Sequence, residues 1–226
     1  MSSFHQTNPK RQKRERNDNP SVRLSKKLSS LLRHRAEDKG LPIRGDGFVN
    51  LSALVVVLKR EGFPAVTPTT ISTVVANCEK KRFELTTEGP QTFIRATQGH
   101  TIKAVKDEEL LAPVMPNEIS ICIHGTYSKS VEAICATGLN KMSRNNIHMA
   151  ESLPGIDGVV SGTRANASVI VIIDVVSAMA AGIPFFRSSN NVILSPGLDG
   201  IIHPAFILDI VSREDFVRNM QTAKAR

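Results

Sequence analysis

The sequence predicts an α+β protein with two lobes. Three successive stretches before residue 79 repeat apolar residues at helical spacing, and a basic β-hairpin pattern follows them. That order is typical of a winged-helix module. After residue 118, many short β-branched runs are interspersed with small helices in no regular alternation, which favours a compact mixed β-sheet over a doubly wound one.

These patterns divide the 226 residues into five segments. We expect a disordered basic tail over 1–20, a winged-helix lobe over 21–102, a linker over 103–117, a sheet lobe over 118–212 and a C-terminal tail over 213–226. The first tail has almost no apolar residues. Its basic cluster fits a nuclear address, a loose nucleic-acid arm or a merely solvated segment.

Charge is distributed unevenly between the two lobes. Residues 21–100 carry thirteen basic and seven acidic side chains, whereas residues 101–226 carry eleven and twelve. A basic first lobe is expected to meet a polyanion such as nucleic acid. Only 4% of the residues are aromatic, so stacking on bases is not expected to be the main means of binding.

The composition argues against several classes of protein. No apolar run is long enough for a membrane span, and the N-terminal residues are too polar for a signal peptide. Cys78, Cys122 and Cys135 lack metal-ligand spacing, so we expect reduced, mostly buried cysteines and no metal. We therefore expect a cytoplasmic or nuclear protein, with a monomer as the default.

Three helices are expected in the first lobe. Residues 22–35 place four leucines on one helical stripe. Asn50 or Ser52 is expected to begin the second helix, and Thr69 or Thr70 the third.

A hairpin should follow these helices. Residues 80–85 and 92–96 form strand patterns on either side of a turn at 86–90. A plain charged surface explains the basic side chains of this hairpin as well as phosphate binding does. The candidates for phosphate contacts are Lys80, Lys81, Arg82 and Arg95.

Residues 119–148 carry the most distinctive pattern of the second lobe. We expect a strand over 119–123 that ends at His124-Gly125-Thr126, and then a helix capped by Ser128. An imidazole, two small residues and free N–H groups at a helix N-terminus suit the phosphates and ribose of a dinucleotide. Taken alone, the three residues are also explained as a simple turn. A cation and a second imidazole follow them, Arg144 and His148.

Further strands should complete the second lobe. Residues 168–174 form a nearly continuous apolar run suited to a central strand, and a short helix is expected over 175–182. The chain contains neither GxGxxG nor GxxxxGK. A dinucleotide would therefore bind without those fingerprints.

Nine ordered motifs connect these elements: LLRH (31–34), KKRF (80–83), IRATQGHT (94–101), HGT (124–126), GL (138–139), MSR (142–144), IH (147–148), SGTR (161–164) and SNNVIL (189–194). Together they resemble the tRNA 2′-phosphotransferase family over about residues 22–212. The resemblance implies an N-terminal winged-helix lobe that binds RNA and a C-terminal NAD-binding lobe of the ADP-ribosyltransferase type.

The reaction implied by this resemblance removes the internal 2′-phosphate left at a tRNA splice junction, with NAD as co-substrate and no metal. The RNA 2′-phosphate attacks the anomeric carbon of the nicotinamide ribose and expels nicotinamide. The ribose 2″-hydroxyl then attacks phosphorus, which releases 2′-hydroxyl RNA and ADP-ribose 1″,2″-cyclic phosphate. Because the nucleophile is already an anion, the first step needs positioning and charge control more than a strong base.

The resemblance also assigns roles to residues. Arg33, His34 and Arg82 are expected to hold the RNA 2′-phosphate, and Arg144 to stabilise charge on the NAD side, since arginine grips phosphate bidentately. His34 is the natural proton shuttle of the second step. The expected NAD-binding residues are His124, Gly125, Thr126, Ser128, His148, Gly162 and Arg164.

Four further motif residues are candidates for RNA contacts. Lys80 and Lys81 are expected to contact neighbouring RNA phosphates. Arg95 and His100 are candidates for RNA binding, but they suit equally well a role in holding the lobes together. Asn146 departs from the family pattern, where a histidine is usual.

Two alternative functions stay open on the sequence alone. One is an ADP-ribosyltransferase that modifies terminal phosphates of RNA or DNA and stops after the first step. The other is a non-catalytic winged-helix protein that binds nucleic acid. The four residues Arg33, His34, Arg82 and Arg144 argue against the second alternative, because RNA affinity alone would not require that histidine.

Overall fold

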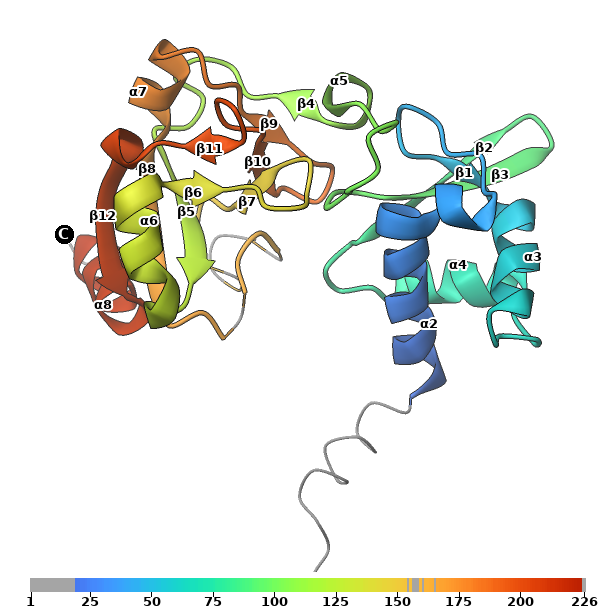
Figure 1. The fold of residues 1–226 in the computed structure, drawn as a ribbon. Coiled ribbons are helices and arrows are strands. Elements are labelled where there is room, and N and C mark those ends of the chain that lie inside the picture. Colours follow the sequence, from blue (N-terminus) through green and yellow to red (C-terminus); the bar gives the residue numbers. More distant parts are fainter. Residues whose placement is uncertain (1–18, 154, 156–158, 160, 165, 225–226) are drawn as a thin grey trace, which may run out of the picture.

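The computed structural model describes residues 19–153, 155, 159, 161–164 and 166–224, which form two lobes side by side (Figure 1). The mixed α+β class predicted from the sequence is confirmed. The disordered tail expected over 1–20 lies outside the described residues up to position 18. Its last two residues, however, belong to the first helix, because Pro20 starts that helix and Asn19 caps it.

Helices make up one side of the first lobe. They are α2 (Pro20–Ser30), the π-helical turn η1 (Leu31–Arg35), the 3₁₀ turn η2 (Glu37–Lys39), α3 (Leu51–Arg60) and α4 (Pro68–Ala76). Asn50 caps α3, as one of the two predicted alternatives. Thr67 caps α4 instead of Thr69 or Thr70, because Pro68 already occupies the first turn.

A three-stranded antiparallel sheet completes the first lobe. It consists of β1 (Val49–Asn50), β3 (Gln91–Ala96) and β2 (Phe83–Glu88) in that order. The predicted hairpin is confirmed, with a shorter turn than expected. The predicted leucine stripe is buried in the core of this lobe, which also takes in Val192 and Leu194 from the second lobe. This shared core joins the two lobes.

The expected linker folds against the lobes. It contains α5 (Asp107–Leu110) and β4 (Ala112–Pro113). Leu110, Leu111 and Val114 are buried, because these few apolar side chains pack inward while the polar residues around them face solvent.

The second lobe contains three small antiparallel sheets in place of the single mixed sheet that we expected. Their strand orders are β4-β9-β10-β7, β11-β6 and β12-β8-β5. The run over 168–174 provides the central strand β8, as predicted. The strands are β5 (Ile121–Thr126), β6 (Leu139–Asn140), β7 (Ile147–Met149), β8 (Val169–Asp174), β9 (Phe186–Arg187), β10 (Ile193–Ser195), β11 (Ile201–Ile202) and β12 (Ile207–Ser212).

Short helices connect and cover these strands. They are η3 (Ser128–Ser130), α6 (Val131–Thr137), α7 (Val175–Ala180), η4 (Pro204–Phe206) and α8 (Arg213–Lys224). The segment expected as a C-terminal tail is thus mainly the helix α8, whose Phe216 is buried beside β8 and β12.

The cysteines are less uniformly buried than expected. Cys122 is buried, Cys78 half-buried and Cys135 exposed. Among the described residues, no helix combines the length and apolar character needed to cross a membrane. The same residues contain no group of three or more His, Cys, Asp or Glu side chains arranged to hold a metal ion.

Candidate functional site

The His124-Gly125-Thr126 motif forms the last three residues of strand β5 and does not follow the strand as a turn. All three residues pair with β8, opposite Val171, Ile170 and Val169. The expectation that the strand ends before these residues is therefore wrong, because the strand begins later and extends further than its apolar run suggested. Gly125 is required for close packing: a Cβ there would lie 2.9 Å from the Cβ of Ala167.

A cavity of about 460 Å³ opens beside this strand. We call it the C-terminal cavity. Ser128 does not line it and is exposed, whereas the next two residues, Lys129 and Ser130, do line it. The predicted residues that the structure brings together in its wall are His124, Gly125, Thr126, Arg144, His148, Gly162 and Arg164.

The two histidines of this cavity are held by backbone carbonyl groups. Nδ1 of His124 lies 2.8 Å from the carbonyl oxygen of His148. Nδ1 must carry the proton, since a carbonyl only accepts, so Nε2 of a neutral ring is left as an acceptor. Burial is the main cause that lowers the pKa of His124, and the charges of Arg164 and Arg144 add to it.

His148 connects the cavity with the first lobe. Its Nδ1 lies 3.0 Å from the carbonyl oxygen of Asn146, and its Nε2 lies 2.8 Å from Oε1 of Gln98. A neutral ring that donates through Nδ1 accepts at Nε2 when the Gln98 amide is turned so that its NH2 group faces the ring. Burial, followed by the charges of Arg144 and Arg33, lowers the pKa of His148 to about 3. The ring is therefore neutral at physiological pH.

Arg164 lies at an open side of the cavity. Its guanidinium carbon is 5.6 Å from the ring centre of Tyr127, within the range of a cation–π contact. The hydroxyl of Tyr127 donates to Oδ1 of Asn166 at 2.9 Å. These contacts place a cation on a fixed aromatic surface.

Arg33 carries a buried charge at the junction of the lobes. Its Nε and Nη2 atoms are buried and have no hydrogen-bond partner within the described part of the chain. Gly99, with φ of +90°, packs against it: a Cβ there would lie 3.4 Å from Nε. Burial, then the charges of Arg144 and Arg82, lowers the pKa of Arg33 to about 10. Arg144 and Arg82 thus lie close enough to Arg33 for their charges to act on it.

None of these three arginines has an acidic partner. Within the described ranges, no ion pair involves Arg33, Arg82 or Arg144, although nine others occur there. Arg144 is exposed and Arg82 half-buried, but Arg33 buries Nε and Nη2 without a counter-charge, which is costly. Such a cluster is typical of a site that receives an anion.

His34 faces this cluster. The hydroxyl of Thr101 donates to the carbonyl oxygen of Arg33 at 3.4 Å, and its oxygen lies 3.1 Å from Nδ1 of His34. The oxygen can accept from Nδ1–H, which leaves Nε2 as the basic nitrogen. Burial, then Arg33 and Arg144, lowers the pKa of His34.

Arg82 is fixed through the loop before it. Its backbone N–H and Nη1 lie 3.5 and 3.6 Å from Sγ of Cys78. Its carbonyl oxygen accepts from the N–H of Thr97 at 3.0 Å.

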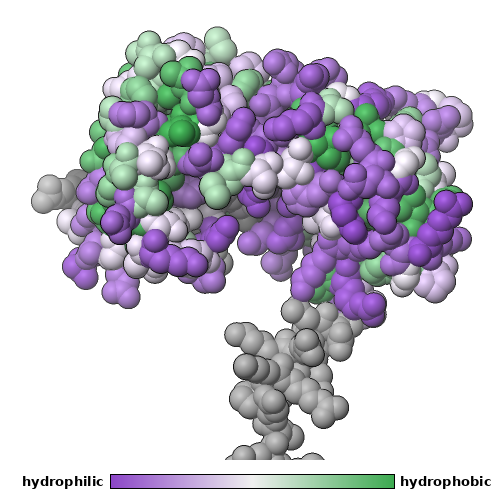
Figure 2. Space-filling view, viewed as in Figure 1, coloured by the Kyte–Doolittle hydropathy of each residue, from purple (hydrophilic) through white to green (hydrophobic). Residues whose placement is uncertain are grey.

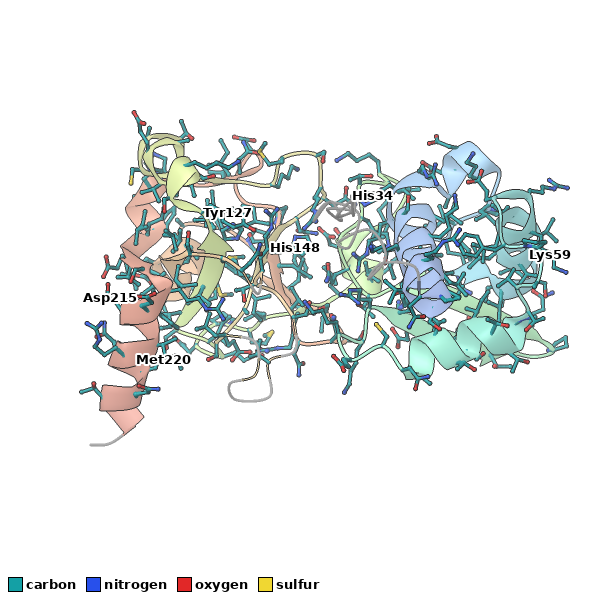
Figure 3. The ribbon with its side chains drawn as sticks, turned by 90° about the horizontal axis from the view of Figure 1, so that it is seen from below. His34, Lys59, Tyr127, His148, Asp215 and Met220 are labelled. Atoms are coloured by element: carbon teal, nitrogen blue, oxygen red, sulfur yellow. The ribbon has the colours of Figure 1, made fainter. Side chains whose placement is uncertain are left out.

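Segment 97–101 and the loop before β7 bring the cations of both lobes together. The N–H of Asn145 donates to the carbonyl oxygen of His100 at 2.9 Å, which ties the loop carrying Arg144 to the first lobe. Figure 3 shows Tyr127, His148 and His34 in succession across this junction. The cluster of Arg33, Arg82 and Arg144 therefore adjoins the C-terminal cavity.

Two of the predicted RNA-binding residues are otherwise engaged. Arg95 forms an ion pair with Glu84 at 2.9 Å, donates to the carbonyl oxygen of Asp46 at 3.0 Å and lies over the ring of Phe48. His100 is only 3% exposed, and its Nε2 has no hydrogen-bond partner within the described residues. Both residues support the fold.

Lys80 and Lys81, the other predicted RNA-binding residues, have no such side-chain partners in the ion pairs of the described residues. The carbonyl oxygen of Lys80 accepts from the Asn190 side chain at 2.9 Å, which fixes the backbone across the lobe junction. Lys81 is exposed and has φ of +43°. No ion pair within the described residues involves either lysine.

Sequence reasoning missed several residues of the site. Gln98 gave no signal beyond its place in a motif, although it contacts His148. Asn146, a departure from the family pattern, donates to Oδ1 of Asp107 at 2.7 Å. Adjacency to predicted residues was the only indication for the others, which are Tyr127, Lys129, Ser130, Asn140 and Lys141.

Comparison with known proteins decides the family. The sequence model of the "RNA 2′-phosphotransferase, Tpt1 / KptA family" matches residues 19–197. The chain belongs to this family. The tRNA 2′-phosphotransferase 1 of Mus musculus is 42% identical over 201 residues, which cover 87% of this chain and 79% of the relative.

More distant members of the RNA 2′-phosphotransferase family match over similar lengths. The tRNA 2′-phosphotransferase of Saccharomyces cerevisiae is 36% identical over 190 residues, 80% of this chain and 81% of the relative. The probable RNA 2′-phosphotransferase of Nostoc punctiforme is 35% identical over 175 residues, 77% of this chain and 91% of the relative. The chain is therefore an enzyme of this family, a transferase.

Proposed function

We propose that this enzyme transfers the splice-junction 2′-phosphate of ligated tRNA to NAD, giving 2′-hydroxyl RNA, nicotinamide and ADP-ribose 1″,2″-cyclic phosphate. One observation carries the proposal. Arg33, Arg82 and Arg144 cluster without an acidic partner in the described structure, and Arg33 keeps two buried N–H-bearing atoms unpaired. A phosphate dianion would supply the missing acceptors and offset the repulsion.

The lobes are assigned accordingly. In this proposal residues 21–102 form a winged-helix lobe that binds RNA, and residues 118–212 form an ADP-ribosyltransferase-like lobe that binds NAD. The helix order and the hairpin support the first assignment, and the polar, cationic C-terminal cavity supports the second.

The residues of the C-terminal cavity fit NAD. Its cations Arg144 and Arg164 would hold the diphosphate, and Nε2 of His124 would accept from a ribose hydroxyl. Neutral His124 and His148 add no positive charge next to the nicotinamide cation. When bound, NAD supplies the anomeric carbon that takes the phosphate as nicotinamide leaves.

The arginines would position the substrates, and His34 would transfer protons. Arg33 and Arg82 would orient the RNA phosphate toward the cavity, and Arg144, tied to the first lobe through Asn145, would stabilise charge between the two substrates. The pKa of His34 is lowered, so its ring is neutral. Its Nε2 can take the proton of the attacking ribose 2″-hydroxyl and give a proton to the departing RNA 2′-oxygen. His34→Ala should therefore lose single-turnover chemistry and not merely RNA affinity.

The test uses a short RNA with one labelled internal 2′-phosphate, incubated with and without NAD. NAD-dependent loss of the label into ADP-ribose 1″,2″-cyclic phosphate is expected. An ADP-ribosylated RNA that persists would mean that only the first step occurs. Salt-sensitive RNA binding with no reaction would contradict the proposal and favour a binding protein.

A further inference from the structure

A groove between α2 and α4 runs up to Arg82. Ser21 and Ser25 line it from α2, and Thr73 and Asn77 line it from α4. Each pair is four residues apart, so each presents one face of its helix to the groove. Arg82 also lines the groove.

The lining of this groove offers accessible hydrogen-bond donors. Ser21 and Asn77 are exposed and Ser25 is half-buried, so their hydroxyl and amide groups are accessible to a ligand in the groove. Lys80 adds a cation whose backbone is already fixed by Asn190. Hydroxyl, amide and ammonium donors are the groups that contact phosphates of nucleic acids without reading the sequence.

Charge distinguishes this groove from its neighbour. A second groove on the other side of the 78–82 loop is lined by Lys81 but also by two acids, Glu79 and Glu84. The α2–α4 groove has two cations, Lys80 and Arg82, against the single acid Glu79. A polyanion therefore prefers the α2–α4 groove.

The surface agrees with this choice. Figure 2 shows mostly hydrophilic side chains over the visible face of the first lobe, with only small hydrophobic areas between them. Figure 1 shows α2 and α4 on the lower side of this lobe, close to each other. Because Arg95 is paired with Glu84 and His100 is buried, we look to other groups to hold the RNA on either side of the reacting phosphate.

We propose that the α2–α4 groove holds the RNA strand that flanks the 2′-phosphate, with its backbone phosphates on Ser21, Ser25, Asn77 and Lys80. The inference rests on the proposed function, because Arg82 must hold the 2′-phosphate for the groove to meet the same strand. According to this inference, the first lobe binds longer RNAs better than short ones and does not distinguish base sequences.

The test compares two substrates with two variants on one helix. Thr73→Glu places a carboxylate in the groove. Thr69→Glu makes the same change one turn earlier on α4, where the side chain is also exposed but outside the groove. Each variant is assayed with a 2′-phosphorylated dinucleotide and with a longer RNA carrying the same phosphate. Binding of the longer RNA is also measured without NAD.

Thr73→Glu should raise the KM and Kd of the longer RNA on the order of tenfold, because a like charge then faces its phosphates. The dinucleotide KM, the KM for NAD and all constants of Thr69→Glu should stay unchanged. Equal effects of the two variants, no effect of Thr73→Glu, or an equal effect on the dinucleotide would each overturn the groove assignment. If the wild-type enzyme turned over neither substrate, the proposed function itself would fail.

Discussion

The cluster of Arg33, Arg82 and Arg144 and the C-terminal cavity share Arg144, but their other polar groups are held differently. In the cluster, Arg33 is buried and lacks partners for two of its atoms within the described structure. In the cavity, His124 and His148 each donate to a backbone carbonyl oxygen. A cation without a partner can bind an anionic group, whereas a neutral ring held by a carbonyl oxygen keeps a fixed orientation. In the function proposed above, the first region receives a phosphate and the second a dinucleotide.

The sharpest test of this difference replaces Arg33. Arg33→Leu should lower kcat/KM on the order of 10³-fold, the loss expected for a preorganised charge contact. It should also raise the melting temperature, because a buried charge without a partner destabilises the fold. Activity assays and thermal unfolding check both effects. A variant that loses activity and stability together would indicate a merely structural arginine.

Acid should destabilise the protein through its buried neutral histidines. Burial, then Arg33, lowers the pKa of His100 to about 3, below the unfolded value of about 6.5. Between these values the unfolded state binds more protons, so stability is present above about pH 6.5 and is lost as the pH falls. His100 alone would remove up to about 1.4 kcal/mol per pH unit.

Urea unfolding at pH 7 and pH 5 measures this effect. His100→Asn should show a smaller loss between the two pH values than the wild type. An equal loss in both proteins would mean that other groups cause the pH dependence.

The connection between the two regions should matter for catalysis. Gln98→Ala removes the contact with His148 and loosens the segment that covers Arg33. We expect kcat to fall on the order of tenfold or more, with smaller changes in either KM, because the substrates lose their relative placement.

A matched control removes a different contact between the lobes. Ser189→Ala breaks the hydrogen bond to Glu84, away from the cluster. It should leave kcat unchanged. If both variants lowered kcat alike, the effect would come from lobe packing in general.

The sequence predicted the elements better than it predicted exposure. Asn50 as a cap, the 168–174 strand and the hairpin follow from local patterns, and each is present. Local patterns could not show that β5 extends through Thr126, since its later residues gain their place only by pairing with β8. Nor could they show that α8 packs through Phe216.

The site shows the same limit. The four catalytic candidates converge, because their motifs sit on elements that meet at the lobe junction. Arg95 and His100 belong to a similar motif, yet their tertiary neighbours Glu84, Phe48 and Arg33 engage or bury them. Which basic residues stay free depends on these long-range contacts.

The smallest expected effects distinguish cations that stabilise the fold from cations that bind RNA. Arg95→Ala should cost about 1–2 kcal/mol of stability, because it breaks a partly buried ion pair and a hydrogen bond to a carbonyl. RNA affinity should not change. Lys80→Ala should do the reverse, weakening RNA binding with little effect on unfolding. Lys59→Ala at the far end of the lobe (Figure 3) should change neither.

The central claim is that the cluster of Arg33, Arg82 and Arg144 binds the 2′-phosphate itself. Its most direct test measures, without NAD, the affinity of two RNAs that differ only in a 2′-phosphate or a 2′-hydroxyl. The wild type should bind the phosphorylated RNA more tightly, and Arg33→Leu should bind both alike. An equal preference for the phosphorylated RNA in wild type and variant would contradict the claim.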